Sequence, residues 1–281
     1  MPSITTIRWQ LAATAVADIA VSALRAEADL TPKPGLVDRR GAGAHTDMNR
    51  DMLYSSAAAL HTALAQCASA ATEMPLGTAL RARIGRIGRA GERAMLAVTG
   101  GVNTHRGALW ALGLLSAAAA ATNGTELTEY AAELARIPDP AASGVQTRLS
   151  HGAKARGRYG VGGAVGQAQA GFPHVTRRAL PALRAARARG ADEPSARIDA
   201  LLALMACLDD TCVLHRGGAA GLHAVQVAAR SVLDAGACRT ALGRARFAEL
   251  DRLCAANLLS PGGSGDLLAA ALFLDAVEQR T

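Results

Sequence analysis

Aromatic residues make up only 3% of this 281-residue sequence, and β-branched residues are sparse. Because both kinds of residue favour strands, their scarcity argues against a β-sheet. Alanine, leucine, arginine and glutamate, which favour helices, are abundant instead. Apolar residues account for 50% of the chain, which is enough to bury a sizeable core. We therefore predict an all-α protein, with a single compact multi-helix domain over residues 1–281.

Several motifs of known chemistry are missing. The sequence has no H-x-x-x-H, HExxH or C-x-x-C pattern, which argues against a zinc site, and no G-x-S-x-G pattern of a serine hydrolase. The five cysteines are an odd number and lie in apolar surroundings, so we expect buried free thiols rather than disulfides. A reducing, cytoplasmic location fits this cysteine usage best.

Long apolar runs are also missing. The most apolar segment, residues 107–122, is sixteen residues long and too short to span a membrane, so it predicts a buried helix. The N-terminal run at 9–28 resembles a signal peptide, but Asp18 interrupts it, and its apolar residues recur at helical spacing. The pattern of the whole chain predicts helices near 8–29, 48–70, 75–98, 104–121, 125–136, 174–189, 195–214, 218–235, 240–256 and 263–278.

The chain is basic, with a net charge of +7 and a pI near 9.7. Such a charge attracts polyanions, whether nucleic acid or a substrate rich in phosphate. Arg86, Arg89 and Arg93 fall on one face of a predicted helix, which is either a solvated basic face or a surface that contacts RNA or phosphate.

Glycine and polar residues gather in four segments, each of which precedes or interrupts a predicted helix: 31–48, 99–110, 209–221 and 259–269. The first turn of a helix has free backbone N–H groups and a favourable dipole, and glycine permits close approach of the backbone. We therefore predict a site for phosphate groups at these glycine-rich helix termini. None of the segments is a Walker loop, because the GK[ST] sequence is absent.

Two carboxylates in the first of these segments indicate a metal site. Asp47 and Asp51 are four residues apart and share one helical face. Joined by Asp38 or Asp210, they could hold Mg²⁺ while leaving coordination positions for water and phosphate oxygens. An exposed acidic helix face is the alternative.

Taken in order, the segments resemble a known family. PKPGLVD with GAHTDM, GVNTHRG, the SHG and YGVGG elements with GFP, DTCVLHRGG and SPGGSGDLLA resemble the triphosphoribosyl-dephospho-CoA synthases over residues 27 to 275. The chain length and the GFPHV sequence are most similar to the version of the enzyme that serves malonate decarboxylase. The version that serves citrate lyase shares the motifs. The resemblance implies an all-helical enzyme that joins ATP to 3′-dephospho-CoA and releases adenine. A separate transferase would attach the product, a prosthetic-group precursor, to an acyl carrier protein.

This reaction suggests roles for the segments. Both substrates carry phosphates, and breaking the N-glycosidic bond of ATP develops positive charge on the ribose. We predict that Asp47 and Asp210 are the leading candidates for the general base or for Mg²⁺ ligands, and that Asp38 and Asp266 are weaker candidates. We predict that His45 or His105 donates a proton to the departing adenine. The expected metal ligands are Asp47, Asp51 and Asp210. The expected substrate-binding residues are Lys33, Asp38, Asn103, Arg106, Arg216, Ser260, Gly262, Gly263, Ser264 and Asp266.

Three positions depart from the family pattern. Val165 and Gln167 stand where Arg and Glu are usual, and Cys212 stands where Asn is usual. Two other classes of protein remain possible: a helical Mg²⁺-dependent ADP-ribosyl hydrolase, which would use water as the acceptor, and a noncatalytic helical module that binds RNA through its basic face. Of these readings we favour the synthase, with ATP, Mg²⁺ and dephospho-CoA as its ligands and neither a membrane nor nucleic acid as a partner.

Overall fold

The computed structural model describes residues 12–124, 126–143 and 151–280. Over these residues the chain forms twelve α-helices and no β-strand, so the all-α prediction is confirmed. No described helix is long and apolar enough to cross a membrane. The α-helices are α1 (Ala13–Asp29), α2 (Arg50–Glu73), α3 (Thr78–Val98), α4 (Arg106–Ala121), α5 (Leu127–Arg136), α6 (His151–Tyr159), α7 (Gly163–Gln169), α8 (Leu180–Ala188), α9 (Glu193–Met205), α10 (Thr211–Asp234), α11 (Ala241–Ala256) and α12 (Gly262–Glu278). Short 3₁₀ or π turns complete the list: η1 (Pro140–Ser143), η2 (Val175–Ala179) and η3 (Ala237–Arg239).

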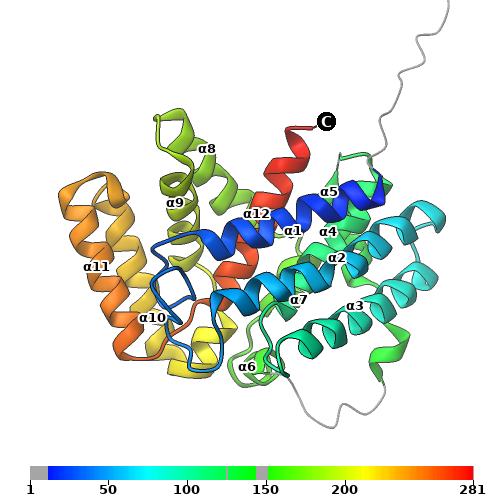
Figure 1. Cartoon of the computed structure of the whole chain (residues 1–281), viewed down its shortest axis with the longest axis horizontal. Helices are drawn as coiled ribbons and strands as arrows, with labels where there is room; N and C mark the ends of the chain where they lie inside the picture. The colour runs from blue at the N-terminus through cyan, green and yellow to red at the C-terminus, as the bar shows by residue number, and fades with distance from the viewer. Residues whose placement is uncertain (1–11, 125, 144–150, 281) are drawn as a thin grey trace, which may run out of the picture.

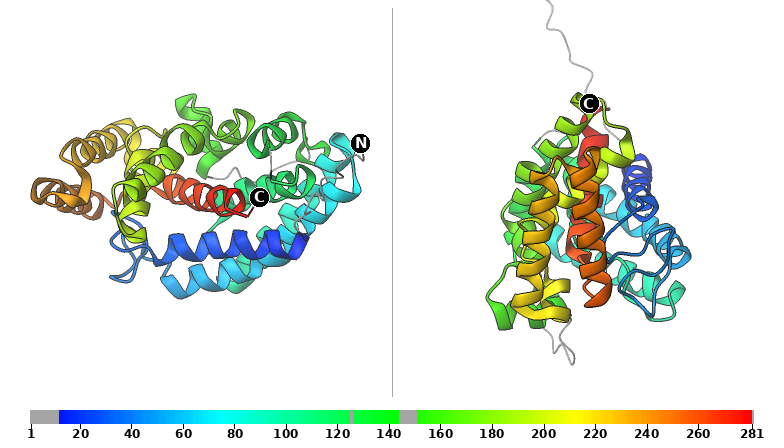
Figure 2. Two further views of the ribbon diagram at one scale, coloured as in Figure 1. Left: turned by 90° about the horizontal axis from the view of Figure 1, so that it is seen from above. Right: turned by 90° about the vertical axis from the view of Figure 1, so that its left-hand side faces the viewer.

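The last helix, α12, lies at the centre of the molecule (Figures 1 and 2). It packs against α1, α4 and α9, while α2 packs against α1, α3 and α4 on one side. Helices α9, α10 and α11 pack in sequence on the other side. The two halves of the chain are thus joined through α12, and one hydrophobic cluster runs through both. The predicted extent of the domain, residues 1–281, stays a prediction.

Helices α4 and α12 are buried along most of their length. Their sequences are rich in alanine, and α4 carries Gly113 and Ser116 in the same buried stretch. Small side chains let neighbouring helices approach closely, and the larger Leu112, Leu268 and Phe273 fill the remaining space, with no exposed surface. The first turns of both helices are therefore held in fixed positions, and these turns contribute to the site described below.

The structure corrects the predicted helix boundaries in the second half of the chain. The helix predicted at 195–214 ends at Met205, because Asp210 caps a new helix, α10, that begins at Thr211. The predicted break before the helix at 218–235 is confirmed as a kink within α10, where Gly218 has non-helical backbone angles. Helices α6 and α7 were not predicted, since their sequences lack a regular apolar spacing. The predicted helix start near residue 8 lies outside the described residues.

All five cysteines are free, as predicted. Two of them, Cys67 and Cys254, are buried, whereas Cys207, Cys212 and Cys238 are half-buried. The expectation of free thiols is confirmed, and that of full burial holds for two of the five.

Candidate active site

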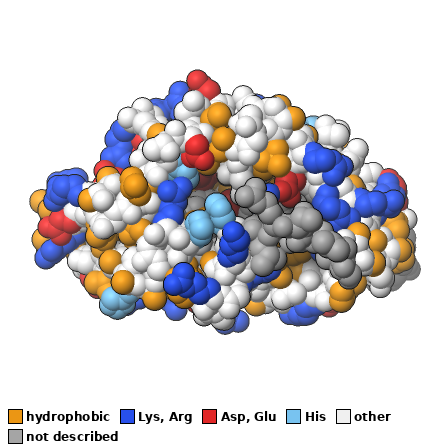
Figure 3. Space-filling model, turned by 90° about the horizontal axis from the view of Figure 1, so that it is seen from below, with side chains coloured by type: hydrophobic (Ala, Val, Ile, Leu, Met, Phe, Trp, Pro, Cys, Tyr) orange, Lys and Arg blue, Asp and Glu red, His pale blue; other side chains and the backbone are white. Residues whose placement is uncertain are grey.

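A cavity of about 1040 Å³ lies where the first turns of α4, α10 and α12 meet the loop between α1 and α2. One face of α3 and parts of α6 and α7 complete its wall. Figure 3 shows histidine, lysine and arginine side chains gathered beside a hollow in this face of the molecule. The volume is at the upper end of the range for small-molecule sites, about 300–1,000 Å³. It can therefore accommodate more than one small molecule.

Most of the residues singled out in the sequence come together in this cavity. Its lining includes Lys33, His45, Asp47, Asn103, His105, Arg106, Asp210, Arg216, Ser260, Gly262, Gly263 and Asp266. Asp38, Asp51 and Ser264 do not line it. Asp38 is buried and accepts hydrogen bonds from the backbone N–H groups of Lys33 and Arg40, both at 2.8 Å. Its carboxylate thus shapes the loop rather than facing the cavity.

Asp210 joins the starts of two helices. Its carboxylate caps α10 by accepting from the backbone N–H groups of Cys212 at 2.9 Å and Val213 at 3.4 Å. It also accepts from the N–H groups of Gly263, at 3.2 Å, and Ser264, at 2.8 Å, and from the Ser264 hydroxyl at 3.0 Å. Both oxygens are occupied by donors from the protein, which leaves little capacity for a metal ion or a substrate proton. Burial nevertheless raises the pKa of Asp210.

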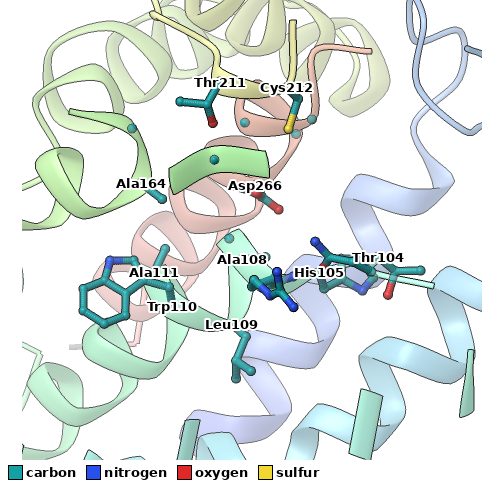
Figure 4. A pocket seen from close by; sticks show the side chains of 18 of the residues that line it. Thr104, His105, Ala108, Leu109, Trp110, Ala111, Ala164, Thr211, Cys212 and Asp266 are labelled. Carbon is teal, nitrogen blue, oxygen red and sulfur yellow. Dashed lines mark hydrogen bonds between the residues drawn. The ribbon is translucent and has the colours of Figure 1, made fainter. Parts of the chain in front are cut away.

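Asp266 is a less heavily bonded carboxyl in the same cavity. It projects from the first turn of α12 toward Ala108 in the first turn of α4, with Cys212 on its other side (Figure 4). Burial raises the pKa of Asp266 well above its usual value, and the negative charges of Asp210 and Glu27 raise it further. A hydrogen bond from the Ala108 backbone opposes this shift. A carboxyl with a strongly raised pKa in a cavity is typical of a group that transfers protons.

His105 lies at the end of a chain of hydroxyl groups. The Thr104 hydroxyl donates to Ser56 Oγ at 2.6 Å, and Ser56 Oγ lies 2.7 Å from His105 Nδ1. In the tautomer in which Ser56 donates its proton to Nδ1, the ring carries its own proton on Nε2. Burial lowers the pKa of His105 to about 4, so the ring is neutral at pH 7. His105 Nε2 has no partner among the described residues and belongs to the cavity lining.

Two of the predicted phosphate-binding cations, Lys33 and Arg106, already have partners. Arg106 Nη2 pairs with the carboxylate of Glu92. Lys33 is 1% exposed, and its Nζ donates to Glu27 Oε1 at 2.6 Å and to the Glu27 carbonyl oxygen at 2.7 Å. Arg216, in contrast, is exposed at the mouth, where its Nη2 lies 3.2 Å from His45 Nδ1. His45 Nε2 in turn lies 2.8 Å from Ser260 Oγ. Burial and the Arg216 charge lower the pKa of His45, so it too is neutral at pH 7.

The predicted metal ligands are not assembled as a group. Among the described residues, no three His, Cys, Asp or Glu side chains come together in a way that could hold a metal ion. Asp51 does not line the cavity, and the oxygens of Asp210 are taken by the donors described above. Asp47 lines the cavity with an exposed side chain, 3.6 Å from His45 Nδ1. A metal ion at this site would need most of its ligands from water or substrate.

Comparison with known proteins agrees with this arrangement. The sequence model of the CitG family, ATP:dephospho-CoA triphosphoribosyl transferase, matches residues 13–281. The chain belongs to this family. A probable 2-(5″-triphosphoribosyl)-3′-dephosphocoenzyme-A synthase of Pseudomonas fluorescens (strain Pf0-1) is 54% identical, covering 94% of this chain and 92% of the relative. The synthase of that name from Klebsiella pneumoniae is 50% identical, covering 93% and 94%. No solved structure matches.

Membership of this transferase family makes the chain an enzyme and confirms the resemblance noted in the sequence. The three departures from the family pattern all lie at the cavity. Val165 and Gln167 belong to α7, and Gln167 Nε2 lies 2.7 Å from His174 Nδ1. Cys212 faces the first turn of α12, and burial raises the pKa of its thiol well above the usual value.

The transferase cavity also contains residues that the sequence analysis missed. Arg81 and Trp110 line it, and so do Glu92 and Asp139. Arg89, which the sequence placed on a basic face with Arg86 and Arg93, donates from Nη1 to Asp139 Oδ2 at 2.6 Å. This pairing removes one charge from the surface proposed for RNA. Three glycines in α3, Gly85, Gly88 and Gly91, could have indicated that this helix contributes to the site. Glycine destabilises a helix interior, so its repeated presence there marks positions of close contact.

Proposed function

We propose that this chain joins ATP to 3′-dephospho-CoA, releasing adenine and leaving the triphosphoribosyl group on the 2′-oxygen of dephospho-CoA. The observation that carries the proposal is the position of Asp266, a carboxyl of raised pKa, in a cavity built from three helix N-termini. Such termini bind phosphate groups. The cavity volume suits two nucleotide-like molecules, and the family relationship agrees with both substrates.

We assign the acceptor's proton to Asp266. In the reaction, the bond between the ribose carbon C1 of ATP and adenine breaks, and a bond from that carbon to the 2′-oxygen of dephospho-CoA forms. The 2′-hydroxyl loses a proton, and adenine gains one. A base works best when its pKa lies near the working pH, and burial moves Asp266 in that direction. Asp210, a leading candidate from the sequence, lacks free oxygen lone pairs for this task.

The positive charge that develops on the ribose would be stabilised by the carboxyl groups of Glu27 and Asp210, which lie near Asp266. Glu27 and Asp210 both lie close enough to raise the pKa of Asp266. Both carboxyl groups are held in place before the reaction, Glu27 by Lys33 and Asp210 by two helix N-termini. Preorganised charges of this kind stabilise a transition state without the cost of rearrangement. Lys33, expected to bind phosphate, therefore positions Glu27 in our proposal.

His105 serves as a hydrogen-bond donor in this mechanism. The sequence suggested that His105 or His45 protonates adenine, but both rings are neutral at pH 7 because burial lowers their pKa values. A neutral His105 still offers the Nε2 proton to an acceptor in the cavity, such as a nitrogen of the departing adenine. The hydroxyl groups of Thr104 and Ser56 hold the ring in that tautomer.

The phosphates of ATP would lie at the cavity mouth. Arg216 is exposed there, and Lys154 and Arg156 belong to the adjacent helix α6. Mg²⁺ bound to ATP would neutralise part of the phosphate charge, with oxygens of the phosphates and water as most of its ligands. Asp47 is the carboxylate that fits this role, because it is exposed at the cavity and not occupied by other donors.

Adenine release tests the proposed reaction. Purified protein would be incubated with ATP and Mg²⁺, with and without 3′-dephospho-CoA, and the products separated by chromatography. We expect adenine only when both substrates are present, with a product heavier than dephospho-CoA by a triphosphoribosyl unit. Adenine release without dephospho-CoA would instead identify a hydrolase, and no release would contradict both activities.

We further propose that the product supplies the prosthetic group of malonate decarboxylase rather than of citrate lyase. The GFPHV sequence at residues 171–175 supports this choice. In this proposal the enzyme works in the cytoplasm, and a phosphoribosyl-dephospho-CoA transferase takes up the product. Deletion of the gene should abolish malonate decarboxylase activity in cell extracts and leave citrate lyase activity intact. The reverse result would assign the chain to citrate lyase.

A further inference from the structure

A buried arginine in the cavity wall lacks hydrogen-bond partners. Arg81, in the first turns of α3, is 6% exposed. Its Nε and Nη1 atoms find no hydrogen-bond partner among the described residues, although Nη1 lies 3.7 Å from Asp139 Oδ2. Burying donors of a charged group without partners costs free energy, so such an atom in a native protein calls for a ligand or another explanation. Arg81 lines the cavity, which is where a ligand could supply the missing acceptors.

Trp110 lies beneath the Arg81 side chain. The Arg81 guanidinium carbon is 5.2 Å from the centroid of the Trp110 ring, a distance at which a cation interacts favourably with the ring face. Trp110 Nε1 also has no partner in the described part of the chain. Figure 4 shows Trp110 and His105 on opposite sides of the start of α4. Arg81 and Trp110 thus mark a region of the cavity separate from the one that His105 faces.

The charges around Arg81 leave a net positive charge. Arg81 and Arg89 both pair with the single carboxylate of Asp139, which is buried. Glycine lets Asp139 approach α3, because a Cβ at Gly85 would fall 2.1 Å from Asp139 Oδ2. One turn further along the same helix, a Cβ at Gly88 would meet no atom of the described residues within 4 Å. Gly88 lines the cavity, so open space adjoins the two cations there.

We propose that Arg81 and Trp110 form a second subsite of the cavity, which receives a phosphate group of one of the two substrates. The inference rests on the proposed function for the identity of the substrates, ATP and dephospho-CoA, whose anionic groups are all phosphates. Guanidinium groups bind phosphate through several N–H donors at once. Arg81 offers two unpartnered nitrogens and Trp110 a third. Arg216 and the start of α6 would bind the phosphates of the other substrate at the mouth.

Binding of inorganic pyrophosphate tests this subsite directly. Calorimetric titration of the full chain would compare the wild type with Arg81→Gln and Arg81→Lys. We expect Arg81→Gln to weaken binding about tenfold or more, and Arg81→Lys to weaken it less, because one charged hydrogen bond contributes roughly that factor. Arg83→Gln is the matched control, since Arg83 lies on the same helix, pairs with Glu73 at 2.8 Å and does not line the cavity. Equal affinities for wild type and Arg81→Gln would overturn the proposal.

A second variant covers the case in which Arg81→Gln does not fold. Trp110→Phe keeps an aromatic ring under Arg81 and removes the indole N–H. We expect weaker pyrophosphate binding by this variant at an unchanged melting temperature, and wild-type affinity would count against the subsite.

Steady-state kinetics identify which substrate uses the subsite. Because our proposal places the phosphates of ATP at the mouth, we expect the KM for dephospho-CoA to rise about tenfold in Arg81→Lys while the KM for ATP stays within twofold. The substrate with the raised KM is the one whose phosphate binds there, and two unchanged KM values would contradict the proposal. The two inferences fail separately: a wild type that releases no adenine contradicts the proposed reaction, whereas the pyrophosphate titration still measures the subsite.

Discussion

The carboxyl group of Asp266 occupies the position that a side chain at Gly107 would need. A Cβ built at Gly107 falls 2.1 Å from Asp266 Oδ2 and 3.0 Å from its Cγ. Gly107 lies in the first turn of α4 and Asp266 in the first turn of α12, so the absence of one side chain sets the distance between a carboxyl and a helix N-terminus. In this contact the positive end of α4 partly offsets the burial that raises the pKa of Asp266.

Replacing Gly107 by alanine should therefore impair catalysis more than folding. The added methyl group must displace the Asp266 carboxyl, and a displacement of about 1 Å at a reacting group can cost up to roughly 100-fold in rate. Alanine also favours the helix by about 1 kcal/mol, which offsets part of the steric cost. We expect kcat for adenine release to fall about 10-fold to 100-fold with a melting temperature near that of the wild type.

Gly166→Ala provides the control for this change. Gly166 is a helical glycine in α7 that does not line the cavity, and a Cβ there meets no atom within 4 Å in the described part of the chain. Its substitution should leave kcat unchanged. A Gly107→Ala enzyme with wild-type kcat would show that the position of Asp266 is not critical.

Asp266→Asn should separate activity from stability. The folded-state pKa of Asp266 is raised, so the folded protein holds this proton more tightly than the unfolded chain does, and the carboxylate form costs stability as pH rises above its usual pKa. Asparagine removes that charge. At pH 8 we expect a higher melting temperature, together with a loss of about 100-fold or more in kcat, the usual scale for a general base.

A carboxylate on the same helix gives the opposite result. Asp275 is buried in α12, where both of its oxygens accept from Arg187 Nη1, at 2.9 and 2.8 Å. Asp275→Asn should lower the melting temperature and keep the kcat of the wild type, because Asp275 does not line the cavity. An Asp266→Asn enzyme that behaves like Asp275→Asn would contradict the role of Asp266 as a base.

Asp210→Ala should mainly destabilise the protein. Asp210 caps α10 and satisfies two N–H groups in the first turn of α12, and it is 3% exposed. Losing a cap costs about 1 kcal/mol, and each buried donor left without a partner adds a similar amount, so we expect a loss of roughly 2–4 kcal/mol in unfolding free energy. Urea denaturation measures this loss.

Asp192→Ala is the comparison for a simple cap. Asp192 accepts from the Ser195 N–H at 2.9 Å, caps only α9 and lies at the surface. Its loss should cost clearly less stability than the loss of Asp210. Equal effects of the two substitutions would show that the link from Asp210 to α12 contributes nothing.

The sequence predicted the helices well, because helix propensity and apolar spacing are local properties. It also indicated the segments at the cavity, since glycine pairs next to charged residues are unusual in an alanine-rich chain. The roles of individual residues could not be predicted, because they depend on contacts between segments that are distant in the sequence. Arg89 and Asp139 are 50 residues apart, and Asp210 and Ser264 are 54 apart. No local pattern shows that Asp210 is occupied by two helix ends, whereas Asp266 keeps fewer partners.

The loop at residues 30–49 illustrates the same limit. Its prolines and glycines indicated a loop that forms part of a binding site, and His45, Asp47 and Lys33 do line the cavity. Lys33, however, pairs with Glu27 in the last turns of α1, and this contact depends on the path of the loop after the helix. Asp47 and Asp51 were placed on one helical face, but α2 begins at Arg50, so Asp47 lies before the helix.

The stability of the protein should fall in mild acid because of His105. Its pKa in the folded state is about 4, against 6.5 ordinarily, so the unfolded chain binds more protons between these values. Folding stability from this residue is therefore fully present above about pH 6.5 and is lost as pH falls toward 4. From the two pKa values the loss is about 2 kcal/mol at pH 5 and about 3 kcal/mol at its limit.

His105→Gln isolates this contribution, because glutamine keeps an N–H donor near the position of Nε2 and does not titrate. Urea denaturation at pH 7 and pH 5 should show a drop for the wild type that exceeds the drop for His105→Gln by about 2 kcal/mol. Other titrating groups contribute equally to both proteins and cancel in the difference. Since His105 acts as a donor in our mechanism, His105→Gln should also retain more adenine release than His105→Ala. Equal pH dependence in the two proteins would mean that His105 keeps its ordinary pKa of 6.5 in the folded state, which would restore it as a candidate acid for protonating adenine.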